Sequence, residues 1–282
     1  MAIKDLAITS LETINVFTLG GDYLFTLDEL QNATISQGEE RVDITGKQGR
    51  KITSFKRNKS VTISGTNGIV SAGLLDMQTG NNGEGWKNGA ATIMWTDTTP
   101  VVAESGSGDP KTYTATLKYT PVSVINDNGY IEIFAKNEDG TLGQRFELSE
   151  SPAPGKFSLS GNTVTFYPGG KIDTKDVPAD VTKDQELVAY YKRTVDAADK
   201  LENMSDGYAE KTQVYIDAIA EDKCGNTYHV QYHIPKGDFS GEFEFSMGDD
   251  QTVQAFEIEA LAGGCSGSSA FWTLTVFGKE NQ

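Results

Sequence analysis

The chain of 282 residues contains little cysteine, little histidine and no long apolar run. Its two cysteines, Cys224 and Cys265, are too few for a disulfide framework, which argues against a small disulfide-stapled secreted fold. Polar residues such as Asp5, Thr9 and Glu12 interrupt the N-terminal segment, so it lacks the apolar stretch of a signal peptide, and no window suits a membrane span. We therefore expect a protein made in the cytoplasm and without a membrane partner.

Positive charge is also scarce. Lysine and arginine number 24 against 40 aspartates and glutamates, which gives a formal net charge of −16. A general nucleic-acid binder presents a basic surface, so this balance argues against that function and favours solubility. One stretch, residues 40–68, departs from the rest because it gathers six basic residues: Lys47, Arg50, Lys51, Lys56, Arg57 and Lys59.

Alternation of apolar and polar residues with period two is abundant, and it predicts strands through most of the chain. The stretch "GKFSLSGNTVTFY" illustrates it, because a Gly161-Asn162 turn would pair Phe157 with Phe166 and Leu159 with Val164. Residues 40–68 predict a long hairpin of the same kind. These patterns indicate an all-β fold, mainly an antiparallel β-sandwich or barrel, with a long protruding β-hairpin.

A helical period is rare, and "NGIVSAGLLDMQTG" carries the best one. Asn67 could cap its start, Val70, Leu74 and Met77 would share one face, and Gly80 could end it. We therefore expect one short flanking α-helix over about 67–79.

No linker composition divides the chain, so residues 1–282 are expected to form a single domain. Two long excursions, 96–112 and 167–184, fall within 96–185. This region is expected to be an elaboration or an insertion.

Signatures of catalysis or metal binding are weak. Ser266 lacks the second glycine of a nucleophile elbow, and Ala135 and Phe146 occupy the ends of a calcium-like loop where acidic residues are needed. His229 and His233 lie on a predicted strand, which separates them by about 13 Å at about 3.3 Å per residue. We predict no enzyme activity, no cofactor and no metal site.

Residues 24–80 and 186–277 together resemble the major tail tube proteins of long-tailed bacteriophages. The first segment, with "ERVDITGKQGRKITSFKRNKSVTISGTNG" and the helix after it, resembles the long hairpin and short flanking helix of that family. The second, "YIDAIAEDKCGNTYHVQYHIPKGDFSGEFEFSMGDDQTVQAFEIEAL", resembles its final paired strands.

The resemblance implies a structural protein of the virion tail that forms hexameric rings, which stack into a conduit for genome passage. It implies as partners further copies of the chain, the tail terminator, the tail tip or baseplate and a tape-measure protein. The resemblance does not decide whether 96–185 is an elaboration on the tube exterior or an insertion specific to this lineage. DNA would be only a transient, non-specific cargo in the lumen.

The charged hairpin fits such an assembly. A ribbon that is polar on both faces gains nothing from a monomer's core, and neighbouring copies could supply its missing contacts. We therefore expect its six cations to meet acidic surfaces of neighbours, although a solvated ribbon or a DNA contact would explain them as well. The acidic residues expected to face the lumen, where they would repel DNA, are Glu39, Asp43, Glu242, Glu244, Glu257 and Glu259.

Two other functions fit a β-rich chain. One is a β-sandwich carbohydrate-binding or adhesion module of a virion or cell surface, which should carry clusters of exposed aromatic residues in its loops. The other is a hydrolase that uses an unrecognised pair of carboxylates.

Overall fold

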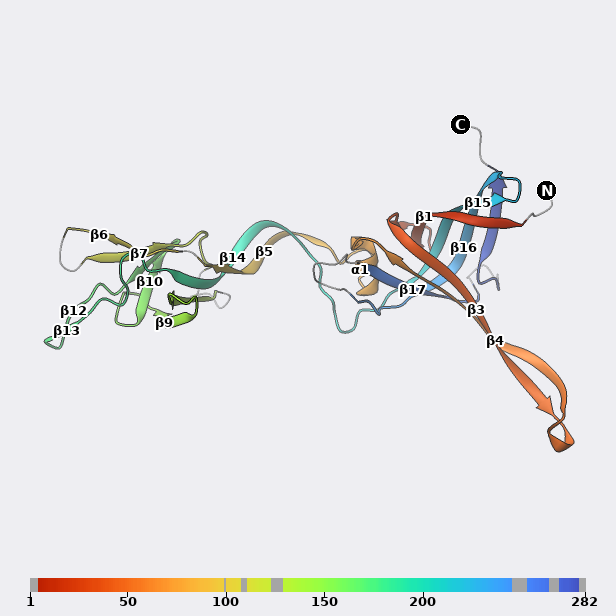
Figure 1. The fold of residues 1–282 in the computed structure, drawn as a ribbon, viewed down its shortest axis with the longest axis horizontal. Coiled ribbons are helices and arrows are strands. Elements are labelled where there is room, and N and C mark those ends of the chain that lie inside the picture. Colours follow the sequence, from red (N-terminus) through yellow and green to blue (C-terminus); the bar gives the residue numbers. More distant parts are fainter. Residues whose placement is uncertain are drawn as a thin grey trace. The chain divides into compact units, whose positions relative to one another are not determined.

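The computed structural model describes residues 5–98, 100–107, 111–122, 129–244, 253–263 and 269–278. The described chain is built from strands, with a single α-helix, so the predicted all-β class is confirmed (Figure 1). It divides into two compact units, the first made of Met1–Lys87 with Lys200–Gln282 and the second of Asn88–Asp199.

In the first unit, strands that are distant in the sequence form one antiparallel sheet. Its order is β2-β1-β15-β16-β17-β4-β3, with β18 paired to β16. The elements of this unit are β1 (Leu6–Thr18), β2 (Tyr23–Leu27), β3 (Leu30–Thr45), the 3-10 turn η1 (Lys47–Gly49), β4 (Lys51–Asn67), α1 (Ala72–Gln78), β15 (Lys211–Asp222), β16 (Thr227–Phe239), β17 (Gln254–Ala260) and β18 (Thr273–Gly278).

This sheet curls around an apolar core (Figure 1). Alternate residues of each strand face the core, as the period-two pattern requires, and they include Ile14, Val61, Ile63, Val214 and Ile258. Residues between them face outward, so each strand presents a second, more polar face. The two histidines of β16 lie on that outer face, as predicted, while Val230 and Ile234 are buried.

The predicted helix is confirmed as α1, but it begins later than expected. Ser71 caps it by accepting a hydrogen bond from the Leu74 N–H at 3.3 Å, whereas Asn67 is the last residue of β4. Leu74 and Met77 are buried in the core, while Val70 lies before the helix and is exposed. The shorter helix follows from β4, which stays paired with β17 through Asn67.

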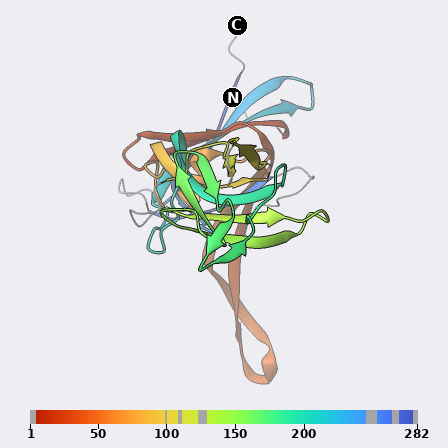
Figure 2. The same ribbon diagram turned by 90° about the vertical axis from the view of Figure 1, so that its left-hand side faces the viewer.

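The predicted long hairpin is confirmed as β3 and β4, which pair from Leu30 and Asn67 out to Thr45 and Lys51. Its inner half is part of the sheet because β17 pairs with Val61–Asn67 of β4. Its outer half has no such neighbour and projects from the rest of its unit (Figures 1 and 2). We call residues 39–57 the outer hairpin.

The second unit is an eight-stranded sheet of order β5-β14-β8-β9-β10-β11-β7-β6, with a separate two-stranded hairpin, β12-β13. It encloses its own core, which includes Phe146, Phe157, Phe166 and Tyr191. Its strands are β5 (Lys87–Asp97), β6 (Ala103–Ser105), β7 (Thr112–Thr116), β8 (Ile131–Lys136), β9 (Leu142–Leu148), β10 (Lys156–Ser160), β11 (Thr163–Phe166), β12 (Gly170–Ile172), β13 (Lys175–Val177) and β14 (Leu187–Lys200).

The hairpin predicted around Gly161 and Asn162 is confirmed, with Phe157 opposite Phe166. The stretch 96–185, expected to be an elaboration or an insertion, falls entirely within the second unit.

Candidate assembly and lumen surfaces

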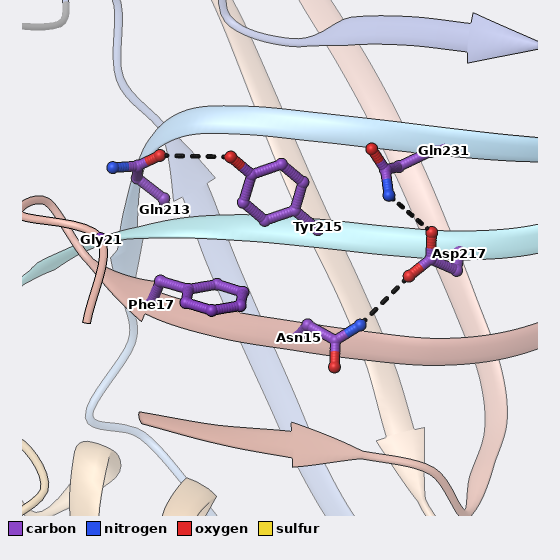
Figure 3. Close-up of a pocket in the computed structure, with 7 residues that line it drawn as sticks. All are labelled: Asn15, Phe17, Gly21, Gln213, Tyr215, Asp217 and Gln231. Carbon is purple, nitrogen blue, oxygen red and sulfur yellow. Dashed lines mark hydrogen bonds between the residues drawn. The ribbon is translucent and has the colours of Figure 1, made fainter. Parts of the chain in front are cut away.

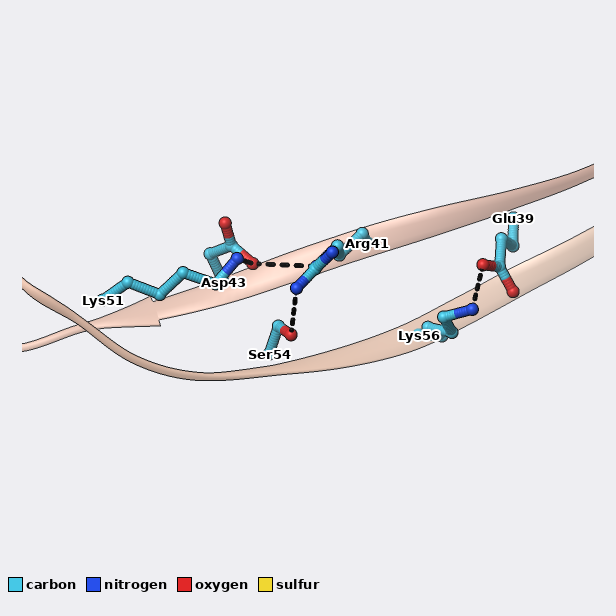
Figure 4. Close-up of polar contacts among 6 residues, drawn as sticks. All are labelled: Glu39, Arg41, Asp43, Lys51, Ser54 and Lys56. Atoms are coloured by element: carbon cyan, nitrogen blue, oxygen red, sulfur yellow. Dashed lines mark hydrogen bonds and ion pairs between the residues drawn. The ribbon is translucent and has the colours of Figure 1, made fainter.

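One face of the outer hairpin is a row of ion pairs and hydrogen bonds between its own strands (Figure 4). Lys56 pairs with Glu39, Lys51 pairs with Asp43 at 2.5 Å, and the Arg41 guanidinium donates to the Ser54 hydroxyl at 3.0 Å. The register produces this row, because Arg41 lies opposite Lys56 and Asp43 opposite Ser54.

A β-bulge sets that register. The pairing shifts between Gly38 and Glu40, and Asn58 on the opposite strand has a positive φ of 51°. The Glu40 carboxylate accepts hydrogen bonds from Arg57 at 2.8 and 3.0 Å and from the Asn58 side chain at 2.6 Å. The bulge is therefore fixed by side chains of the ribbon itself.

These contacts keep the carboxylates ionised but add little stability. The hydrogen bond from Arg57 lowers the pKa of Glu40, and the hydrogen bond from Lys51 lowers the pKa of Asp43. All of these groups are exposed to solvent, where water and salt screen an ion pair and leave it little net effect on stability. The ion pairs therefore help to fix the cross-strand register of the hairpin but contribute little to its stability.

The pairing divides the six cations of the predicted assembly surface into two groups. Lys51, Lys56 and Arg57 are matched by carboxylates of the same hairpin. The other three have no ion-pair partner within the described part of the chain: Lys47, Arg50 and Lys59. These three cations are available to pair with carboxylates of another molecule, and we call them the free cations.

The expectation that the ribbon is polar on both faces is wrong. Val42 lies opposite Phe55, and Ile44 follows two residues later on the same face. Ile44 is 45% exposed and Phe55 48%, and at the tip Ile52 is 66% exposed. We call Val42, Ile44 and Phe55 the apolar strip. In "ERVDIT" the apolar residues Val42 and Ile44 alternate with charged ones, and this pattern predicts an apolar face. The six cations nearby drew attention to the charge of the segment instead.

A different surface carries the predicted lumen acids of β17. Glu257 and Glu259 are exposed on the outer face of the sheet, where they lie opposite Ser64 and Thr62 of β4. Those residues are in turn opposite Thr34 and Ser36 of β3. We call this set the hydroxyl–acid face: Thr34, Ser36, Thr62, Ser64, Glu257 and Glu259.

Glu242 extends this face, because a shallow pocket of about 350 Å³ is lined by both Glu242 and Glu257 together with Ser64 and Ser240. Glu244 is exposed two residues further along the chain. The structure thus brings Glu242, Glu257 and Glu259 to one surface.

Glu39 and Asp43 lie elsewhere, on the outer hairpin. Along β3 they alternate with Thr34 and Ser36, so they belong to the opposite face of that strand. Lys56 neutralises Glu39, whereas Lys51 and Arg41 neutralise Asp43. Exposure of these two residues to a lumen stays a prediction.

The outer face of β1, β15 and β16 holds a second pocket of about 350 Å³ (Figure 3). In its lining the Asp217 carboxylate accepts hydrogen bonds from Asn15 at 3.1 Å and Gln231 at 2.9 Å. The Tyr215 hydroxyl donates to Gln213 at 3.4 Å. The polar groups that line this pocket largely satisfy one another, which is the arrangement of a stable sheet surface.

His233, next to this pocket, predicts a dependence of stability on pH. Its imidazole stacks on Tyr215 with ring centroids 4.3 Å apart, and burial lowers its pKa below the usual value of 6.5. The unfolded chain therefore takes up a proton that the folded chain does not, and stability should fall as pH drops below about 6.5. Chemical denaturation between pH 7.5 and 5 should show a smaller loss in His233→Gln than in the wild type, and equal losses would contradict this.

Within the described residues, no group of three or more His, Cys, Asp or Glu could hold a metal ion. The helix found there is too short to span a membrane. Cys224 is a free, exposed thiol. Ser266 and Cys265 lie outside the described residues.

A comparison with models of protein families gives a match. The family model of the YomU/Tube protein family matches residues 6–273, which is nearly the whole chain. The comparison with curated proteins found no match.

Proposed function

The chain belongs to the YomU/Tube protein family, and from this premise we propose that its copies form hexameric rings that stack into a phage tail tube. The tube would be a structural part of the virion tail and a conduit for genome passage into the host. Its partners would be further copies, with the tail terminator, the tail tip or baseplate and a tape-measure protein. DNA would be a transient cargo, and the chain would act without catalysis.

The outer hairpin carries this proposal. None of residues 38–60, all of which the structure describes, is buried, although they form one of the most regular elements of the unit. A monomer gains little from such a ribbon, and its apolar strip and free edges are a liability in water. Contacts with other copies would remove that liability.

The hydroxyl–acid face supports the conduit. Serine and threonine side chains are small and neutral, and the charges among the six residues that define this face are the carboxylates of Glu257 and Glu259. A lumen lined in this way would repel phosphates rather than hold them, because fixed cationic contacts would slow a sliding polyanion. We therefore place Glu242, Glu257 and Glu259 at the lumen in this proposal.

The second unit, which contains 96–185, has a core of its own. It can therefore vary without disturbing the core of the first unit. We propose that it decorates the tube exterior.

The free cations provide the test. Lys47→Glu, Arg50→Glu and Lys59→Glu together should raise the protein concentration needed for assembly by on the order of tenfold or more, because three attractive charges become repulsive toward an acidic neighbour. Negative-stain microscopy across a concentration series would measure this.

The matched control exchanges one internal ion pair, Glu39→Lys with Lys56→Glu, which keeps both the pair and the net charge. It should assemble like the wild type. Wild-type protein that stays monomeric at every concentration would refute the tube itself, whereas normal assembly of the triple variant would refute only the role of the free cations.

A further inference from the structure

The sheet of the first unit leaves an open groove of about 450 Å³ between β1 and β3. Apolar side chains from four strands form most of its wall, namely Ile8, Leu11, Ile35, Ile216, Ala218 and Tyr232. Ile8 is 56% exposed there, and Leu11, Ile35 and Tyr232 are only partly buried against the core. The groove is therefore an apolar surface that the monomer leaves in contact with water.

The groove exists because the curled sheet does not close. β3 is the last strand at one end of the order, and β2 at the other end pairs only with Ile14–Phe17 of β1. Within the described part of the chain, Leu6–Leu11 of β1 therefore lacks a neighbour on its β2 side. The strands β1 and β3 thus approach each other without pairing beside an apolar floor, and an unpaired strand edge of this kind can accept an added strand.

The same chain carries an apolar surface that fits this groove but cannot reach it. The apolar strip lies on β3, and Ile35 of that same strand lines the groove. From Ile35 to Ile44 the paired strand rises about 3.3 Å per residue, or about 30 Å in total. A hairpin that is paired along its whole length cannot fold back over that distance, so a second copy must supply the occupant.

Charge is complementary as well. Lys47 and Arg50 are at the tip of the outer hairpin and belong to the free cations. Glu12 follows Leu11 in the chain, and its carboxylate accepts a hydrogen bond at 2.6 Å from Ser10, which lines the groove. Glu12 has no cationic partner among the described residues. A hairpin seated in the groove would bring opposite charges together at its rim.

Resting on the proposed function, we propose that the groove between β1 and β3 receives the outer hairpin of a second copy. The apolar strip packs against Ile8, Leu11 and Ile35, and the ribbon edge pairs with a free edge of β1 or β3. The contact is head-to-tail, since groove and strip are different surfaces of one chain. Each copy therefore offers a free groove and a free hairpin, so the contact propagates along a row of copies.

Cysteine crosslinking between two variants tests the contact. In a background of Cys224→Ser and Cys265→Ser, one variant carries Ile8→Cys in the groove and the other carries Ile44→Cys in the apolar strip. Both sites are exposed, so both variants should fold. Mixed and oxidised under assembly conditions, they should give a disulfide-linked dimer that neither variant gives alone.

The matched control replaces Ile8→Cys by Ile69→Cys, which is also an exposed isoleucine of the first unit at 54%. The groove pair should yield at least ten times more dimer than this control. Equal yields, or no dimer from samples that form tubes, would overturn the groove contact and leave the tube standing. Absence of both dimers and wild-type tubes would overturn the groove contact together with the proposed function.

Discussion

Deletion of residues 41–56, with Glu40 joined to Arg57 through an Asn-Gly turn, is expected to abolish tube assembly and to leave the first unit folded. Glu40 and Arg57 are already directly opposite each other, and a two-residue Asn-Gly loop suits that position. The deleted residues contribute no buried side chain, so the melting temperature should change little. Assembly should fail because the apolar strip, Lys47 and Arg50 are all removed.

Sedimentation and negative-stain microscopy at matched concentrations would measure this effect. The control shortens another exposed hairpin, β12-β13 of the second unit, by replacing residues 171–176 with Asn-Gly. That variant should still form tubes. Tubes from the first variant, or loss of tubes from both, would contradict a specific role for the outer hairpin.

The second large effect concerns the core. Leu74→Ala should destabilise the first unit by about 2–5 kcal/mol, since Leu74 is fully buried where α1 packs on the sheet. The helix lies very close to β2: a Cβ on Gly73 would be 2.3 Å from the Phe25 Cβ, so the site has little freedom to collapse around the cavity. The melting temperature of this unit should fall by roughly 5–15 °C.

Calorimetry can follow this change, with the transition of the second unit as an internal reference. The matched control is Val70→Ala, because Val70 is 45% exposed and precedes the helix. It should cost less than about 0.5 kcal/mol. Similar shifts for both variants would show that α1 does not hold the core of the first unit.

The contrast between Leu74 and Val70 shows what the sequence could predict of the fold. Helical spacing correctly identified Leu74 and Met77, because they satisfy a local period. The start of the helix depends on β4 staying paired with β17 through Asn67, which lies opposite Gln254, 187 positions further along the chain. Local patterns carry no information about such a partner.

The surface of the hairpin was harder to predict than its existence. Which cations are free depends on the cross-strand register, and that register is set by the bulge at Asn58. The groove is even harder to predict from the sequence, because its existence depends on the order of strands in the sheet. No local pattern marks the boundaries of the second unit, because they fall at the start of β5 and the end of β14, whose sequences look like ordinary strands.

A three-dimensional reconstruction of the wild-type assembly by cryo-electron microscopy would test the proposed tube. We expect a hollow tube of stacked six-fold rings, with Glu257 and Glu259 lining the lumen and each outer hairpin in contact with another copy. A protein that remains monomeric at all concentrations, or a tube in which the outer hairpins contact only solvent, would contradict it.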